Sequence, residues 1–191
     1  MSDDTAADFN ARGRAHNAQR RYDLALGALD EALRLDPRFV EALSHRGFAW
    51  NGKKQYDRAL QDLDEAIRLD PTFAGAFNNR GYARNGKRQY DRAIRDLDEA
   101  IRLDPGFADA FNGRGFAWNG KGEYDRAIAD FDAALRLNPT FASALNNRGL
   151  AWMGKGDYDR AVRDFDAALR LDPDYAAAFV NREAALRASG R

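Results

Sequence analysis

The sequence predicts an all-α solenoid of five helix–turn–helix repeats followed by one capping helix. The first observation is that the chain contains five prolines, each 34 residues after the previous one: Pro37, Pro71, Pro105, Pro139 and Pro173. The second is that apolar residues recur at helical spacing in two stripes within each unit, with glycine between the stripes. A fixed period of this length is typical of repeat proteins, in which each unit buries its apolar face against its neighbours.

The proline register defines the organisation of the chain. The five units cover residues 6–39, 40–73, 74–107, 108–141 and 142–175. Residues 176–189 match only the first half of a unit, and we expect them to form a capping helix with a solvated outer face. Because no linker interrupts the register, we expect residues 1–191 to form a single domain.

Composition limits the possible functions. Thirty basic and thirty acidic side chains give a formal net charge of zero, so no global field attracts nucleic acid or an anionic membrane. With no Cys and only two His, we expect no catalytic residue, no metal site and no cofactor. No apolar run approaches the roughly 20 residues that span a bilayer, and the first residues do not resemble a secretory signal. We therefore expect a cytoplasmic protein, or a periplasmic one if a leader has been removed.

The ends of the helices have local signals. Side-chain oxygens that can cap the first helix lie at Ser2, Asp3, Asp4 and Thr5. We expect the first helix of each later unit to end at a left-handed glycine, at Gly52, Gly86, Gly120 and Gly154, with second glycines at Gly122 and Gly156. The second helices should end at Asp-Pro or Asn-Pro, because proline disfavours the helical conformation of the residue before it.

Glycines inside the first helices require a packing explanation, because glycine in a helix costs about 0.5–1 kcal/mol relative to alanine. They lie at Gly13, Gly47, Gly81, Gly115 and Gly149. We expect each to face an alanine of its own second helix, as Gly115 would face Ala127. On the second helices an acid precedes an arginine by four residues, as Asp64 precedes Arg68, and we expect solvated ion pairs there.

In the fourth unit, the large, small and aromatic positions are occupied by Phe111, Gly115, Trp118, Tyr124, Ala127, Phe131, Ala134 and Pro139. This pattern resembles the tetratricopeptide repeat family, and the resemblance covers residues 6–175. The chain departs from the family before the glycine, where the family usually has leucine and the third unit has Arg80. We expect this arginine to pack its stem and to pair with an acid such as Asp96 or Asp98.

The resemblance implies a right-handed superhelix whose first helices line a concave groove that binds peptides or partner segments. A first amide column facing this groove holds Asn10, Ser44, Asn78, Asn112 and Asn146. An aromatic column holds Arg14, Phe48, Tyr82, Phe116 and Leu150, and a second amide column holds Asn17, Asn51, Asn85, Asn119 and Met153. Apart from Arg14, Asn17 and Met153, these residues are the predicted partner contacts.

The chemistry of these columns suits a peptide. An asparagine amide offers a donor and an acceptor to a peptide backbone, and an aromatic ring supplies apolar contact. The two amide columns and the aromatic column are expected to project into the groove without a packing role. A further column, which includes Asn79 and Asn147, is expected to form hydrogen bonds within or between repeats. A clamp for acidic C-terminal peptides is not expected, because Arg14 is the only cation in the groove columns.

The sequence thus favours a non-enzymatic scaffold that binds a protein or peptide, as a monomer or with weak self-association. It predicts neither membrane insertion nor nucleic-acid binding. One alternative is a self-assembling structural scaffold. A second and less favoured alternative is an RNA-binding solenoid, which would need a basic stripe that the balanced charge does not provide.

Overall fold

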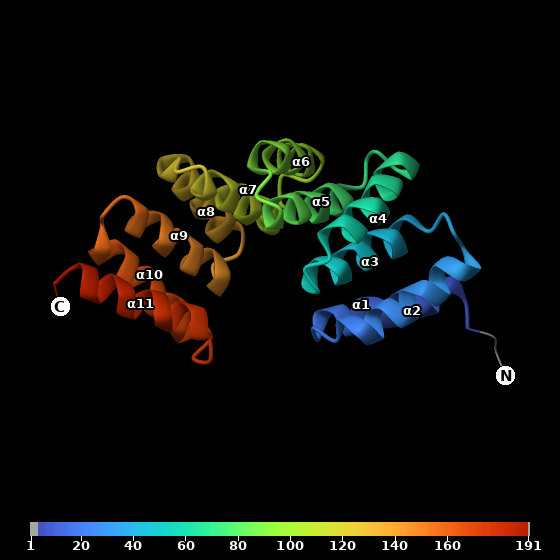
Figure 1. Ribbon diagram of the computed structural model, residues 1–191, viewed down its shortest axis with the longest axis horizontal. Coiled ribbons are helices and arrows are strands. Elements are labelled where there is room, and N and C mark those ends of the chain that lie inside the picture. Colours follow the sequence, from blue (N-terminus) through green and yellow to red (C-terminus); the bar gives the residue numbers. More distant parts are fainter. Residues whose placement is uncertain (1–3, 191) are drawn as a thin grey trace. The chain divides into compact units, whose positions relative to one another are not determined.

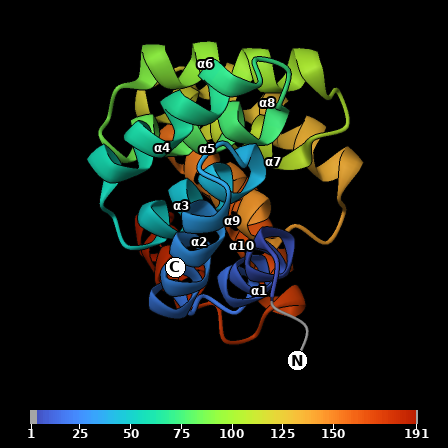
Figure 2. The ribbon, with the colours of Figure 1, turned by 90° about the vertical axis from the view of Figure 1, so that its right-hand side faces the viewer.

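A computed structural model describes residues 4–190, and over this range all regular elements are helices (Figures 1 and 2). The chain divides into two compact units, Met1–Asp104 and Pro105–Arg191, which we describe separately. The helices of the first unit are α1 (Ala6–Ala18), α2 (Tyr22–Leu35), α3 (Val40–Gly52), α4 (Tyr56–Leu69), α5 (Ala74–Gly86) and α6 (Tyr90–Leu103). Those of the second unit are α7 (Ala108–Gly120), α8 (Tyr124–Leu137), α9 (Ala142–Gly154), α10 (Tyr158–Leu171) and α11 (Ala176–Ala188). This arrangement confirms the predicted all-α fold of helix–turn–helix repeats.

Within each unit, the first helices of successive repeats lie closer together than the second helices. In the first unit α1 contacts α3 and α3 contacts α5, whereas the described residues of α2, α4 and α6 make no such contacts with one another. In the second unit α7 contacts α9 and α9 contacts α11, and the described parts of α8 and α10 do not meet. Each unit therefore curves with its first helices on the inner side.

The helix ends follow the predicted signals at two kinds of position. Thr5 caps α1: its Oγ1 accepts from Asp8 N at 3.2 Å, and the Asp8 carboxylate accepts from Thr5 N at 2.9 Å. Ser2 and Asp3, which the sequence also offers as caps, lie outside the described residues. The second helix α4 ends at an extended Asp70 before Pro71, as predicted. The Asp70 carboxylate accepts from Thr72 N at 2.8 Å, which stabilises the turn.

The turns between paired helices use two of the predicted glycines, Gly122 and Gly156, as left-handed residues. The predicted glycines at positions 52, 86, 120 and 154 are instead the last residues of their helices and have no positive φ. The left-handed residue lies two positions later, at Arg20, Lys54 and Arg88 in the first unit and at Gly122 and Gly156 in the second. Glycine is needed at position 86 for a different reason: a β-carbon there would overlap the ring of Tyr56 from the preceding repeat.

The glycines inside the first helices also face a different partner from the one predicted. A β-carbon on Gly115 would lie 2.7 Å from Cε1 of Phe131, and one on Gly81 would lie 2.6 Å from Cγ of Leu97. The expected partner of Gly115, Ala127, is buried but lies one helical turn before Phe131. Both residues lie on the same face of α8, so spacing alone could not decide which of them meets the glycine.

The outer face of α11 is less polar than the sequence predicts. Phe179 is 57% exposed and Val180 is 65% exposed, although Glu183 beside them forms an ion pair with Arg182 at 3.3 Å. The expected solvated surface of the capping helix is therefore wrong at these two positions.

We predict that Gly115→Leu lowers the free energy of unfolding by more than about 2 kcal/mol, because the added side chain overlaps the fully buried ring of Phe131. Gly27 in α2 provides the control, since no atom lies within 4 Å of its missing β-carbon. Gly27→Ala should stabilise the protein by about 0.5–1 kcal/mol through helix propensity. Chemical denaturation measures both effects, and an unchanged midpoint for Gly115→Leu would contradict the close contact.

Candidate ligand-binding face

The first amide column lies between successive first helices instead of on an open surface. In the second unit Asn112 and Asn146 are buried, and each accepts a hydrogen bond from the next repeat. Asn147 Nδ2 donates to Asn112 Oδ1 at 3.0 Å, and Asn181 Nδ2 donates to Asn146 Oδ1 at 2.9 Å. These side chains therefore join α7 to α9 and α9 to α11.

The first unit has the same arrangement with different residue types. Asn79 Nδ2 donates to Ser44 Oγ at 3.1 Å, and His45 Nδ1 lies 2.8 Å from the amide oxygen of Asn10. Because Asn10 Oδ1 is an acceptor, the imidazole donates to it. Ser44 and Asn78 are buried, and Asn10 is half-buried. The predicted hydrogen bonding of the Asn79 column is confirmed, whereas the expectation that the first amide column has no packing role is wrong.

The second amide column binds the backbone of the next first helix. Asn17 Nδ2 donates to the carbonyl oxygen of His45, and Asn51 Nδ2 donates to that of Asn79, both at 2.8 Å. Asn17 and Asn85 are buried, whereas Asn51, Asn119 and Met153 are half-buried. The amide donors of Asn17 and Asn51 thus already have acceptors within the protein. The expectation that the second amide column has no packing role is therefore wrong.

The aromatic column is the one groove column that leaves substantial carbon surface open. Phe48 in α3 and Phe116 in α7 are each 41% exposed, and Tyr82 and Leu150 are half-buried. The ring of Tyr22 packs at a tilt against Phe48, with 6.5 Å between the ring centroids, and holds it in place. In each unit this column offers two neighbouring apolar contacts on successive first helices.

Burial lowers the pKa of His45, whose imidazole is hydrogen-bonded to Asn10. The positive charge of Arg14 lowers that pKa further, and the carboxylate of Glu41 opposes both effects. Among residues 4–190, no three His, Cys, Asp or Glu side chains converge as a metal site requires. Within the same range, we find no helix whose length and hydropathy would let it traverse a bilayer.

A family model described as tetratricopeptide repeat matches residues 10–73, 78–140, 119–176 and 146–189. The chain belongs to the tetratricopeptide repeat family. Proteins of this family are in general non-enzymatic scaffolds for protein interactions. No curated protein matches the sequence.

Solved tetratricopeptide repeat structures share the fold. TTC0263, a thermophilic protein from Thermus thermophilus, is 23% identical with a TM-score of 0.86, over 96% of this chain and 100% of that one. MamA is 31% identical with a TM-score of 0.65, over 86% of this chain and 96% of that one. YrrB, whose structure is described as a tetratricopeptide repeat protein with an unusual peptide-binding site, is 23% identical with a TM-score of 0.63. That match covers 93% of this chain and 92% of YrrB.

The arginine at the family's leucine position joins tetratricopeptide repeats to one another. Arg80 donates from Nε and Nη2 to both oxygens of Asp96 in its own repeat, at 3.1 and 2.7 Å. Its Nη1 donates to Asp64 of the preceding repeat at 2.7 Å. This confirms the predicted pairing with Asp96. The expected pair of Asp64 with Arg68 is wrong, because Arg68 binds Glu65, three residues earlier, at 2.6 Å.

Arg148 repeats this geometry in the second unit. It binds both oxygens of Asp164 at 2.8 and 2.6 Å and reaches Asp132 of the preceding repeat at 2.6 Å. The hydrogen bond to Asp164 raises the pKa of the Arg148 guanidinium, so this group is charged at every accessible pH. Asp164 is buried, and its charge is matched by an arginine in direct contact.

In the third repeat, a second arginine binds the buried Asp96. Arg84, where the second, fourth and fifth repeats have tryptophan, lies 2.7 Å from Oδ2 of Asp96. Burial raises the pKa of Asp96, against the opposing effect of its hydrogen bond to Arg80 and the charge of Arg84. Burial also lowers the pKa of Arg84. Asp96 therefore keeps one cationic partner if the other is removed.

We predict that Arg148→Leu lowers the free energy of unfolding by about 3–5 kcal/mol, because it leaves Asp164 buried without a counter-ion. Arg80→Leu is the matched comparison. It should lower the free energy of unfolding by a clearly smaller amount, since Arg84 still binds Asp96. Chemical denaturation at neutral pH measures both values. Equal losses for the two variants would contradict the compensating role of Arg84.

Proposed function

We propose that the inner face of each unit binds an extended, apolar segment of a partner protein, with the aromatic column as the main contact. The observation that carries the proposal is the exposure of Phe48 and Phe116 on first helices whose neighbouring groove positions are mostly buried or half-buried. Large apolar side chains that stay open beside a packed polar surface are typical of binding sites. A preformed ring also binds at little entropic cost.

The asparagines of the two amide columns contribute less to ligand binding than the sequence predicts. The first amide column accepts hydrogen bonds between repeats, as at Asn112 and Asn146, and the second amide column donates them, as at Asn17 and Asn51. These groups are therefore not available to the backbone of a ligand. We therefore assign the main recognition to Phe48, Tyr82, Phe116 and Leu150. The first amide column serves chiefly to hold the repeats together. Selectivity would come from the apolar side chains of the ligand, with weak dependence on salt.

The peptide-binding site described for YrrB supports a peptide as the class of ligand. That protein shares the fold at low identity, so the residues of its site are not transferred to this chain. The support for the named residues comes from their exposure and their position on the first helices.

Self-assembly is the second candidate function, favoured by the open Phe179 and Val180 on α11. Sedimentation of the chain over a range of concentrations separates it from peptide binding. Association that is lost in Phe179→Ser would favour assembly, whereas one constant mass would favour the binding scaffold.

We predict that Phe48→Ala combined with Phe116→Ala weakens binding of a peptide selected from a displayed library on the intact chain by about 1–3 kcal/mol. The control combines Leu35→Ala with Leu137→Ala, which truncates side chains that are 44% and 46% exposed at the ends of second helices. Calorimetry with circular dichroism measures affinity and folding together. If the aromatic variant keeps both wild-type affinity and helicity, the inner face is not the binding site.

A further inference from the structure

The turns between paired helices in the first unit form an edge with a local positive charge. The exposed cations of this basic turn edge are Arg20, Arg21, Lys54, Arg58, Arg88 and Arg92. Ion pairs of Lys53 with Asp23 and of Lys87 with Asp57 link each turn to the preceding repeat, so the turns lie next to one another. The charges of the first unit balance as a whole, so the positive charge at this edge is local.

Three of these cations occupy a backbone conformation that disfavours them. The φ angles of Arg20, Lys54 and Arg88 are 56°, 59° and 56°, in the left-handed region where a β-carbon is strained. The equivalent positions in the second unit are Gly122 and Gly156, which adopt this conformation without strain. The first unit therefore carries a charged side chain, at a cost in stability, at three successive turns where glycine would fit better. Strain of this kind, retained at repeated surface positions, indicates a use for the side chain.

The residue after each left-handed position also differs in charge between the two units. It is Arg21, Gln55 and Gln89 in the first unit, and Glu123 and Asp157 in the second. The turns of the second unit therefore carry a carboxylate where those of the first carry a cation or a neutral amide. The difference in charge belongs to the turns themselves and does not follow from the repeat fold.

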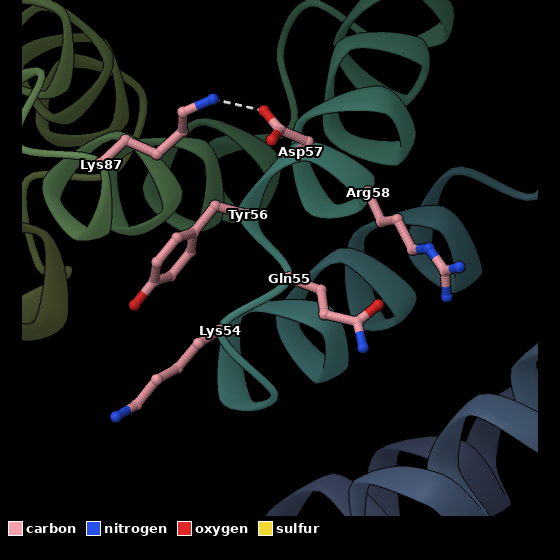
Figure 3. Close-up of a pocket in the computed structure, with 6 residues that line it drawn as sticks. All are labelled: Lys54, Gln55, Tyr56, Asp57, Arg58 and Lys87. Atoms are coloured by element: carbon pink, nitrogen blue, oxygen red, sulfur yellow. Dashed lines mark hydrogen bonds and ion pairs between the residues drawn. The ribbon is translucent and has the colours of Figure 1, made fainter.

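The three strained cations are also available to a ligand. Within residues 4–190, no ion pair or side-chain hydrogen bond engages Arg20, Lys54 or Arg88, whereas Lys53 and Lys87 are paired. Between the second and third turns lies an open pocket of about 300 Å³, lined by Lys54, Gln55, Tyr56, Asp57, Arg58 and Lys87 (Figure 3). A pocket with a tyrosine ring and cations at its rim suits a short side chain that ends in a carboxylate.

We propose that the basic turn edge binds an acidic peptide segment, whose carboxylates contact Arg20, Lys54 and Arg88 in turn. The carboxylates of Asp23 and Asp57 on the same edge favour a peptide over a nucleic acid as the ligand. A duplex carries a phosphate charge about every 1.7 Å along its axis and would place phosphates against these acids. A peptide can place neutral residues there and acidic residues at the cations. This site lies at the ends of the helices and is separate from the aromatic column of the inner face.

The test uses the intact chain and a fluorescein-labelled peptide in which each glutamate is followed by two serines, at low salt. The triple variant Arg20→Gly, Lys54→Gly, Arg88→Gly removes the charge and relieves the strain. We expect about a tenfold loss of affinity in fluorescence anisotropy, since three exposed ion pairs are lost. The melting temperature of this variant should equal or exceed that of the wild type, which excludes unfolding as the cause. Restoring charge with Arg20→Lys, Lys54→Arg, Arg88→Lys should restore binding.

The matched control removes three cations of the first unit that lie away from this edge, with Arg34→Gln, Arg38→Gln and Arg95→Gln. Its affinity should stay within about twofold of the wild type, because distant exposed charges are screened. Phe48→Ala should also keep the affinity, which separates this site from the inner face. Wild-type affinity in the glycine variant, or an equal loss in the control, would overturn the proposal. Tighter binding of duplex DNA than of the peptide would overturn it in favour of a nucleic acid.

Discussion

Hydrogen bonds from an asparagine of one repeat to the first helix of its neighbour determine how the inner face is built. Asn51 reaches the backbone of α5, and Asn181 reaches the side chain of Asn146 in α9. Amides are short, so they bring successive first helices into contact while the second helices stay apart. The same bonds use the groups that a groove would otherwise offer to a peptide backbone. The aromatic column differs from both amide columns, because Phe48 and Phe116 keep 41% of their surface exposed.

The two units pack their repeats through the same arginine contacts but differ in the residues of their turns. Arg80 and Arg148 each bind an acid in their own repeat and one in the preceding repeat, so repeat spacing is fixed equally in both units. At the turns, the second unit uses glycine for the left-handed residue, whereas the first unit carries cations there. Stability alone favours glycine. The cations of the first unit at these turns are therefore not explained by the stability of the repeat fold.

The fold could be predicted from the sequence because its signals are local and repeated. Proline spacing defined the repeat boundaries, and Thr5 and Asp70 behave as their types predict. One error is local, because the left-handed residue of each turn lies two positions after the glycine that ends the first helix. The errors in predicted contacts concern which residues of neighbouring helices meet. Gly115 meets Phe131 instead of Ala127, and Asp64 binds an arginine 16 residues later instead of four. Helical spacing shows which residues share a face but not which of them meets the neighbouring helix. For the same reason, spacing alone predicts an open groove position for the first amide column, although its side chains lie between helices.

Asparagines of neighbouring first helices bind each other and thereby hold the repeats together. A double-mutant cycle with Asn146→Ala and Asn181→Ala, followed by chemical denaturation, tests this role most directly. The amide nitrogen of Asn181 lies 2.9 Å from the amide oxygen of Asn146, so either substitution removes their hydrogen bond. We predict a coupling free energy of about 0.5–1.5 kcal/mol, the usual range for one hydrogen bond. Strictly additive losses would contradict the claim and would make the asparagines candidates for ligand contact again.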